Sequence, residues 1–292
     1  MSLIGRMKNL VAFSNIGITK RIHFSTSTEP GVMENKLLAG KNVLVTGAGK
    51  NIGRAIAVEM AKQGANVFFT DIDRESSLNL EKQLGNYSVI TRAFLSDISR
   101  YEDIDNLCDE LINDGINIDI LINNVGIQFK GNTIFELDIG EWEKTYDVNI
   151  LGPIYLTKSI VNRMRSSQTE GSVLFITSIH QWSVRTVASY SSSKAALGMI
   201  VDELALDLAP YGIRVNGIAP GWIAEDNQGR PLKHKYCPLY ESSISPHYIG
   251  RAAVYMSSDY FSRHTTGTVL KIDGGLSLWN HCCEQKQQKS KI

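Results

Sequence analysis

The chain has 292 residues, 43% of them hydrophobic, and its 30 lysines and arginines balance 30 aspartates and glutamates. A formal net charge of zero gives no general electrostatic reason to bind nucleic acid or an anionic membrane surface, so we expect neither partner. No apolar run approaches the ~18 residues that a membrane span requires. The four cysteines lack metal-site spacing, so we expect no metal and free thiols in a reducing compartment.

The first 32 residues have the composition of a targeting presequence or a disordered extension. Residues 1–28 carry several lysines and arginines, many serines and threonines, and no acid before Glu29. This composition is typical of a mitochondrial or plastid presequence, so we expect a location in the mitochondrial matrix. Translation from Met33 would remove the segment.

Between about residues 40 and 276, short β-branched runs alternate with longer helical patterns such as 52–65 and 101–115. The predicted strands are residues 42–46, 66–70, 87–93, 119–123, 172–177, 214–219 and 268–273. Their apolar residues are continuous rather than alternating, which is typical of strands buried on both faces of a parallel sheet.

We therefore predict an α/β fold, with one catalytic domain over residues 33–280. Its core would be a Rossmann-like, doubly wound parallel sheet of about seven strands, with helices on both faces. Ligands are then expected at the carboxyl ends of the strands, near the point where the strand order reverses.

The first predicted strand leads into TGAGKNIGR, residues 46–54. A glycine-rich turn between a strand and a helix lets backbone N–H groups approach a pyrophosphate, which the helix N-terminus also favours. This turn predicts a nucleotide site, although a tight turn without a ligand has the same glycines.

Asp71 ends the second predicted strand, where a carboxylate can accept hydrogen bonds from an adenosine ribose and repel a 2′-phosphate. Asp71 therefore favours NAD as the cofactor. If Lys50 or Arg74 lies near Asp71 in the fold, its positive charge could hold a 2′-phosphate, so NADP is the alternative cofactor. Asp71 could also serve as a helix N-cap.

Motifs along residues 40–276 resemble, in order and spacing, those of the short-chain dehydrogenase/reductase family. They are TGAGKNIG (46–53), LSDIS around Asp97, NNVG (123–126), DVNILGP with Asn149, FITSI with Ser178, YSSSK with Tyr190 and Lys194, APGW with Pro220 and Gly221, and KIDGG (271–275).

The resemblance implies hydride transfer between an alcohol carbon and a nicotinamide, with Ser178, Tyr190, Lys194 and Asn149 as catalytic residues. Ser178 would steady the substrate oxygen, Tyr190 would carry its proton, and Asn149 would hold a water that relays protons to Lys194. The implied cofactor contacts are Gly47, Gly49, Asn51, Ile52, Gly53, Asp71, Asp97, Ile98, Asn124, Val125, Gly126, Tyr190, Lys194, Pro220, Gly221 and Ile223.

Tyr190 and Lys194 are four residues apart and therefore share one face of a helix. A free phenol titrates near pH ~10, which is too high for a base at neutral pH. We expect the nearby ammonium of Lys194 to lower the pKa of Tyr190 toward the working range.

Three positions depart from the family's pattern. Asn51 replaces the second glycine of the turn, and asparagine tolerates positive φ better than other non-glycine residues. Val125 replaces a smaller alanine, and no threonine follows Pro220 and Gly221 at the usual place.

The substrate is predicted less sharply. Residues 222–240 would form the substrate lid, and their basic cluster of Arg230, Lys233, His234 and Lys235 could meet the phosphates of a CoA or carrier-protein thioester. The polar segment after Ser178 instead favours a sugar or polyol. A 3-oxoacyl-thioester reductase and a cofactor-sensing binding protein are the alternatives.

Two further expectations concern assembly and location. The family commonly assembles through the helix that carries Tyr190, so we expect a homo-oligomer, a tetramer or a dimer. The chain ends in a polar tail, residues 281–292, whose last residues Ser290, Lys291 and Ile292 are similar to the S-K-L peroxisomal signal. Peroxisome and cytoplasm are therefore the alternative locations.

Overall fold

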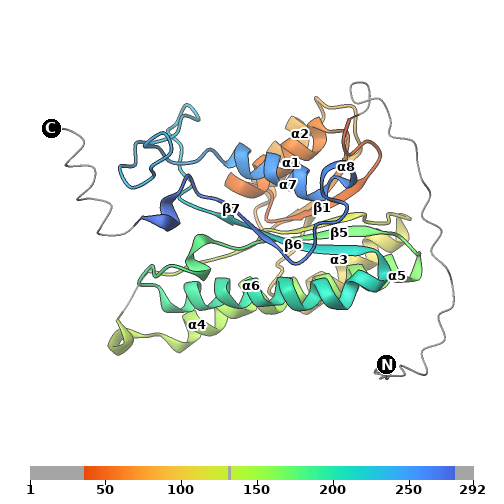
Figure 1. The fold of residues 1–292 in the computed structure, drawn as a ribbon. Coiled ribbons are helices and arrows are strands. Elements are labelled where there is room, and N and C mark those ends of the chain that lie inside the picture. The colour runs from red at the N-terminus through yellow and green to blue at the C-terminus, as the bar shows by residue number, and fades with distance from the viewer. Residues whose placement is uncertain (1–35, 131–132, 280–292) are drawn as a thin grey trace, which may run out of the picture. The chain divides into compact units, whose positions relative to one another are not determined.

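Seven parallel strands form one sheet in the order β3-β2-β1-β4-β5-β6-β7 (Figure 1). The strands are β1 (Asn42–Thr46), β2 (Asn66–Asp71), β3 (Thr91–Leu95), β4 (Ile120–Asn123), β5 (Gly171–Ile176), β6 (Ile213–Pro220) and β7 (Val269–Ile272). The helices are α1 (Asn51–Lys62), α2 (Arg74–Leu84), α3 (Tyr101–Asn113), α4 (Ile139–Tyr146), α5 (Gly152–Ser166), α6 (Ala188–Leu208), α7 (Pro246–Ser257) and α8 (Asp259–Ser262). The predicted fold class is confirmed.

The computed structural model describes residues 36–130 and 133–279. The predicted presequence at 1–32, the alternative start at Met33 and the polar tail at 281–292 lie outside the described residues. Within these residues, no helix is long and apolar enough to span a bilayer, and no group of three or more His, Cys, Asp or Glu could hold a metal ion.

The third strand differs from its prediction. It covers Thr91–Leu95 rather than residues 87–93, because Tyr87 still belongs to the turn after α2, where its N–H donates to the carbonyl of Leu84. The side chain of Asn66 accepts the N–H of Ile90 at 3.0 Å. The ladder with β2 therefore starts only when Thr91 pairs with Val67.

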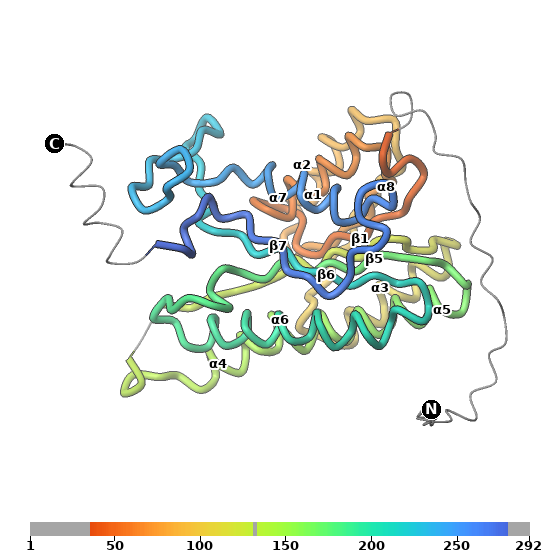
Figure 2. The backbone as a smooth tube through the Cα atoms, viewed as in Figure 1, coloured from red at the N-terminus to blue at the C-terminus, as the bar shows by residue number. Residues whose placement is uncertain are grey.

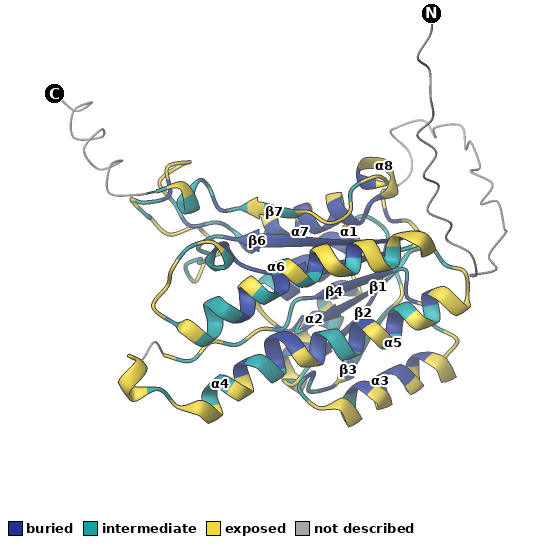
Figure 3. Ribbon diagram, turned by 60° about the horizontal axis from the view of Figure 1, so that its bottom comes forward, coloured by how far each residue is buried: buried dark blue, intermediate teal, exposed yellow. Residues whose placement is uncertain are grey.

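Successive strand residues point to opposite faces of the sheet, and each face has its own apolar core. Val43 and Val45 pack in the core beneath α1 and α7, whereas Leu44 packs in the core shared by α3, α5 and α6. Helices α1 and α7 lie side by side although nearly 200 residues separate them (Figure 2). The five central strands, β2, β1, β4, β5 and β6, are buried between the two helix layers (Figure 3), which explains their continuous apolar runs. The edge strands β3 and β7 are only partly buried.

The strand order reverses beside β1, which pairs with β2 on one side and with β4 on the other. The chain therefore leaves β1 and β4 toward opposite halves of the sheet. A crevice at the carboxyl ends of these two strands is where doubly wound sheets bind their ligands. The described structure places the glycine-rich turn at this edge.

Gly152 allows one close approach on which the site depends. It begins α5, directly after an irregular helical turn at Asp147–Leu151 that carries Asn149. A Cβ at position 152 would overlap the carbonyl oxygen of Ile98. Only glycine lets this turn lie against the segment that follows β3.

We predict that Gly152→Ala lowers the free energy of unfolding by about 3 kcal/mol, since the added methyl meets backbone that cannot rotate away. Urea unfolding followed by circular dichroism measures this. Gly85→Ala is the control, because Gly85 has a helical φ of −57° and its nearest neighbour would be 3.4 Å from the new methyl. Equal effects of the two substitutions would contradict the prediction.

Candidate active site

The glycine-rich turn after β1 is shaped by three positions. Gly47 has a φ of +63°, and a Cβ at Gly53 would overlap the carbonyl oxygen of Gly47. These two glycines therefore allow the turn itself and the close packing of α1 on it. Asn51 has a φ of +49°, so asparagine does adopt the left-handed conformation at the position where the family has glycine.

Asp71 ties the end of β2 to this turn. One oxygen of its carboxylate accepts the N–H of Gly49 at 2.7 Å, and the other accepts the N–H of Asp73 at 2.9 Å. Asp73 caps α2 by accepting the N–H groups of Glu75 and Ser76, and it pairs with the ammonium of Lys50 at 2.7 Å. Lys50 of the turn is therefore paired with Asp73, and not with Asp71.

Asn124 links the two strands at the reversal of strand order. Its side-chain NH₂ donates to the carbonyls of Thr46 at 2.9 Å and Gly47 at 3.0 Å, and its own N–H donates to the hydroxyl of Thr46 at 3.0 Å. Val125 follows, with a methyl 3.0 Å from where a Cβ of Gly47 would lie. These contacts fix the floor of the crevice between β1 and β4.

Asp97 and Ile98 follow β3 at the same edge of the sheet. The half-buried carboxylate of Asp97 accepts the N–H of Ser99 at 2.9 Å and its hydroxyl at 2.7 Å. Ile98 is 2% exposed. The carboxylate of Asp97 thus holds the turn after β3, whereas Ile98 packs in the core shared by α3, α5 and α6 and lies against Gly152.

Ser178, Tyr190 and Lys194 line one cavity of about 340 Å³, which we call the catalytic cavity. It is also lined by seven other residues with an expected role in binding the cofactor: Asn51, Ile52, Asn124, Gly126, Pro220, Gly221 and Ile223. Gly47, Gly49, Gly53, Asp71, Asp97, Ile98 and Val125 do not line it; they shape the turns around it.

Six residues line the catalytic cavity without a predicted catalytic or cofactor role: Ile127, Gln128, Ile176, Thr177, Arg185 and Trp222. Arg185 and Trp222 belong to the segment after Ser178 and to the predicted lid, which were both expected on the substrate side. Position alone could have indicated two of the others. Gln128 comes two residues after NNVG, and Thr177 comes between β5 and Ser178, so both follow a strand at its carboxyl end.

The ammonium of Lys194 is buried, with 3% of the residue exposed. It donates to the carbonyl of Ile176 at 2.9 Å, and no carboxylate pairs with it among residues 36–130 and 133–279. Burial lowers the pKa of Lys194 to about 8. A Cβ at Gly126 would lie 3.2 Å from this ammonium, so Gly126 leaves its face toward the cavity open.

Tyr190 differs from the expectation. Its pKa is raised, because burial of the phenol outweighs the lowering by a hydrogen bond from Ser178 and by the charge of Arg185. The ammonium of Lys194 lies 5.7 Å from the centre of the phenol ring. The protein alone thus does not bring Tyr190 into the working range.

Asn149 is fully buried and bonds to backbone far from it in sequence. Its side-chain oxygen accepts the N–H of Ile127 at 2.8 Å, while its NH₂ donates to the carbonyl of Ile127 and to the hydroxyl of Ser193, both at 3.0 Å. Asn149 therefore fixes the segment after β4 beside Lys194. Its water relay stays a prediction.

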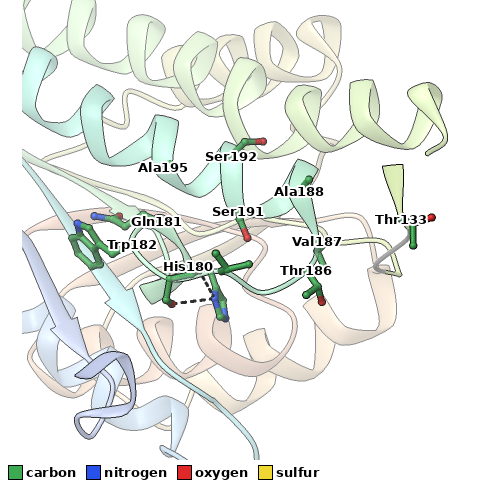
Figure 4. A pocket seen from close by; sticks show the side chains of 12 residues that line it. Thr133, His180, Gln181, Trp182, Thr186, Val187, Ala188, Ser191, Ser192 and Ala195 are labelled. Carbon is green, nitrogen blue, oxygen red and sulfur yellow. Dashed lines mark hydrogen bonds between the residues drawn. The ribbon is translucent and has the colours of Figure 1, made fainter. Parts of the chain in front are cut away.

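A second cavity, of about 660 Å³, lies beside the first turns of α6 (Figure 4). We call it the outer cavity. Gln181 and Trp182 lie at one end of it and Thr133 at the other. Two lining polar atoms, Oε1 of Gln181 and Oγ of Ser191, are buried without a hydrogen-bond partner. Polar groups thus form part of a lining that is mostly apolar.

The basic cluster of the predicted lid is largely engaged within the lid. Arg230 pairs with Asp226 at 2.8 Å, the ring of His234 lies 4.5 Å from that of Trp222, and the ammonium of Lys235 lies 4.4 Å from the centre of the Tyr236 ring. These contacts weaken the case for a phosphate-binding lid.

Comparisons with known proteins match this geometry. A family model described as short chain dehydrogenase matches residues 41–235. The chain belongs to the short-chain dehydrogenase family. It is accordingly an NAD(P)-dependent oxidoreductase that acts on CH–OH groups.

Glucose 1-dehydrogenase 2 of Bacillus subtilis (strain 168) is 34% identical over 256 residues, which cover 84% of this chain and 97% of that protein. The 3-oxoacyl-[acyl-carrier-protein] reductase of Aquifex aeolicus (strain VF5) is 31% identical, over 84% of this chain and 100% of that protein. The structure of a 3-ketoacyl-(acyl-carrier-protein) reductase from Brucella melitensis complexed with NADH is 27% identical, with a TM-score of 0.75, and covers 82% of this chain and 99% of that one.

The residues present fit a nicotinamide cofactor. Lys194 has three N–H donors, of which the carbonyl of Ile176 takes one. Its buried ammonium faces a cavity that also contacts the glycine-rich turn through Asn51 and Ile52. Such a buried donor needs an acceptor, and a ribose hydroxyl of the cofactor would supply one.

We predict a pH dependence of stability that comes from Lys194. Between its folded pKa of about 8 and its ordinary value of 10.5, the unfolded chain holds the proton that the folded chain has lost, so the free energy of unfolding rises with pH. The raised pKa of Tyr190 acts in the opposite direction only above pH 10. From pH 8 to pH 10, the free energy of unfolding of the wild type should rise by about 2 kcal/mol relative to that of Lys194→Met.

Urea unfolding at a series of pH values measures the difference. Lys158→Met, at an exposed position of α5, is the control and should run parallel to wild type. A constant difference between wild type and Lys194→Met would show that the buried group stays charged throughout.

Proposed function

We propose that this chain interconverts a secondary alcohol and a ketone by hydride transfer, with Tyr190 as the general acid and base. The observation that carries the proposal is the single cavity lined by Ser178, Tyr190 and Lys194 next to the glycine-rich turn. At the carboxyl edge of the sheet, this cavity brings together a group that can carry a proton (Tyr190), a hydroxyl that can bond to the substrate oxygen (Ser178) and a buried cation (Lys194).

In the oxidation, the hydroxyl of Ser178 donates a hydrogen bond to the substrate oxygen and Tyr190 accepts the hydroxyl proton. The buried ammonium of Lys194 orients the ribose, while the hydrogen bond from Ser178 and the charge of Arg185 lower the pKa of Tyr190 against the effect of burial. When bound, the nicotinamide accepts or supplies the hydride, and in its oxidised form it adds a positive charge. Asn149 holds the segment around Gly126 so that Lys194 faces the cavity.

We infer that NAD is preferred over NADP. Asp71 places a carboxylate beside the turn, and Lys50 is already paired with Asp73, so its charge is balanced before a 2′-phosphate arrives. Arg74 has no carboxylate partner among the described residues, which keeps NADP as the second cofactor.

For the substrate we propose a sugar or polyol. The outer cavity has a partly polar lining, and a relative named glucose dehydrogenase matches most of the chain. The second candidate is a 3-oxoacyl thioester, which the name of another relative supports but the engaged lid cations do not. A cofactor-sensing protein without turnover is the alternative outside catalysis.

We also propose a homo-oligomer, because α6 exposes Met199 at 61% and Leu206 at 77% while Leu197 and Val201 pack on the sheet. Sedimentation velocity of the purified chain tests the assembly. The mitochondrial matrix stays our proposed location, which import of a fluorescent fusion of the full chain would test.

Tyr190→Phe should lower kcat about 1000-fold or more, because the proton carrier is lost, and should leave NADH binding within a few-fold. Absorbance of reduced nicotinamide against a panel of sugars, polyols and thioesters gives the rate, and fluorescence titration gives the affinity. Tyr146→Phe is the control, since Tyr146 bonds Ser192 outside the catalytic cavity. Retained turnover in Tyr190→Phe would refute the mechanism, whereas a wild type that binds NADH without any turnover would favour the sensor.

Asp73→Ser should raise the affinity for NADPH about fivefold at low salt, because serine still caps α2 while Lys50 is released toward a 2′-phosphate. Affinity for NADH should change less. Asp138→Ser is the matched control, because Asp138 caps α4 in the same way. An unchanged NADPH affinity would mean that the Lys50–Asp73 pair does not set cofactor choice.

A further inference from the structure

Arg185 is a cation that the proposed proton and hydride transfer does not require. It lies in the segment between Ser178 and α6, is exposed, and lines the catalytic cavity together with Ser178 and Tyr190. Within residues 36–130 and 133–279, its guanidinium has no carboxylate partner. Its one side-chain hydrogen bond there is with His180, at 3.4 Å. Most of its five N–H donors are thus available to a ligand.

His180 holds the guanidinium in place. Its Nδ1 lies 3.2 Å from the carbonyl of Ser183, and a ring nitrogen can bond to this carbonyl only when it carries a proton. Burial lowers the pKa of His180, so Nε2 of the neutral ring is left as an acceptor for Arg185. His180 is therefore a positioning residue, and the chain from Ser183 through His180 to Arg185 directs the cation to the cavity.

The guanidinium is close enough to the reacting centre to act on it electrostatically. Its positive charge lowers the pKa of Tyr190 against the effect of burial. The ring of His180 lies 6.3 Å from that of Tyr190, edge to face. A substrate whose hydroxyl reaches Tyr190 would therefore have its neighbouring carbons near Arg185.

The charges of the cavity indicate what Arg185 would bind. Among the described residues that line it, only Arg185 and Lys194 carry a formal charge. Lys194 is buried, whereas Arg185 is exposed. One available positive charge matches a monoanion better than a phosphate dianion. The amide of Gln128 also lines the cavity and adds a neutral donor. A planar guanidinium binds a carboxylate through two parallel hydrogen bonds.

Resting on the function proposed above, we propose that Arg185 binds a carboxylate of the substrate, which narrows the proposed sugar or polyol to a polyol that carries a carboxylate, a hydroxy acid. Aldonic acids belong to this class and keep the character of a polyol. In the oxidation, the carbinol C–H bond breaks and its electron pair leaves as hydride to the oxidised nicotinamide. The hydroxyl proton passes to Tyr190, the C=O bond forms, and the carboxylate is unchanged.

The test compares short 2-hydroxy, 3-hydroxy and aldonic acids with their primary amides, and includes a sugar phosphate. For at least one pair, wild type should have a kcat/KM for the acid at least about 30-fold above that for the amide. Arg185→Gln should remove most of this ratio. The ratio is the readout, because the loss of Arg185 also raises the pKa of Tyr190 and slows both substrates alike.

Arg263→Gln is the matched control, since Arg263 is paired with Glu170, lines neither the catalytic nor the outer cavity and should leave the ratio unchanged. A second readout is independent of turnover: calorimetry of acid and amide binding to Tyr190→Phe loaded with NAD should give the same preference, and Arg185→Gln in that background should abolish it.

The outcomes separate the two proposals. Turnover of neutral polyols with a ratio that Arg185→Gln does not change, or a preference for the sugar phosphate, would overturn the carboxylate site alone. A loss of NADH affinity in Arg185→Gln equal to the loss for the acid would assign Arg185 to the cofactor and also overturn it. No Tyr190-dependent turnover of any alcohol would instead refute the proposed function.

Discussion

The burial of one ammonium group constrains the arrangement of the whole site. Lys194 is surrounded by the ends of β4 and β5 and by its own helix, and the described residues offer it a backbone carbonyl rather than a carboxylate. A buried cation without a counter-charge destabilises the fold, so its surroundings must be held in place by other contacts. Gly126 leaves the space, Asn149 fixes the neighbouring loop, and the open side of the ammonium is left to a ligand.

The asparagines of the motifs act mainly by shaping this cavity. Asn124 joins β1 to β4, and Asn149 joins the irregular turn before α5 to the backbone of Ile127. Gly152 allows that turn to approach the segment after β3. A dinucleotide bound where the strand order reverses would therefore contact loops that side-chain amides already hold in place. This reduces the entropic cost of binding.

The doubly wound parallel sheet and the gathering of Ser178, Tyr190 and Lys194 could be predicted, because the continuous apolar runs and the ordered motifs can be read directly from the sequence. Three features could not. The third strand starts late because a side chain from β2 caps Ile90. The pKa of Tyr190 is raised because burial, which is a tertiary property, outweighs its neighbours. Arg185 belongs to the segment expected on the substrate side, but no spacing in the sequence indicates its hydrogen bond to His180.

One carboxylate has two unrelated duties in the cofactor half of the site. Asp73 accepts hydrogen bonds from the free backbone N–H groups at the start of α2 and also balances the charge of Lys50. If the Lys50–Asp73 pair sets the cofactor preference as proposed, a substitution at this position would change the stability of a helix terminus and the choice of coenzyme at the same time. Serine would keep the first role and give up the second.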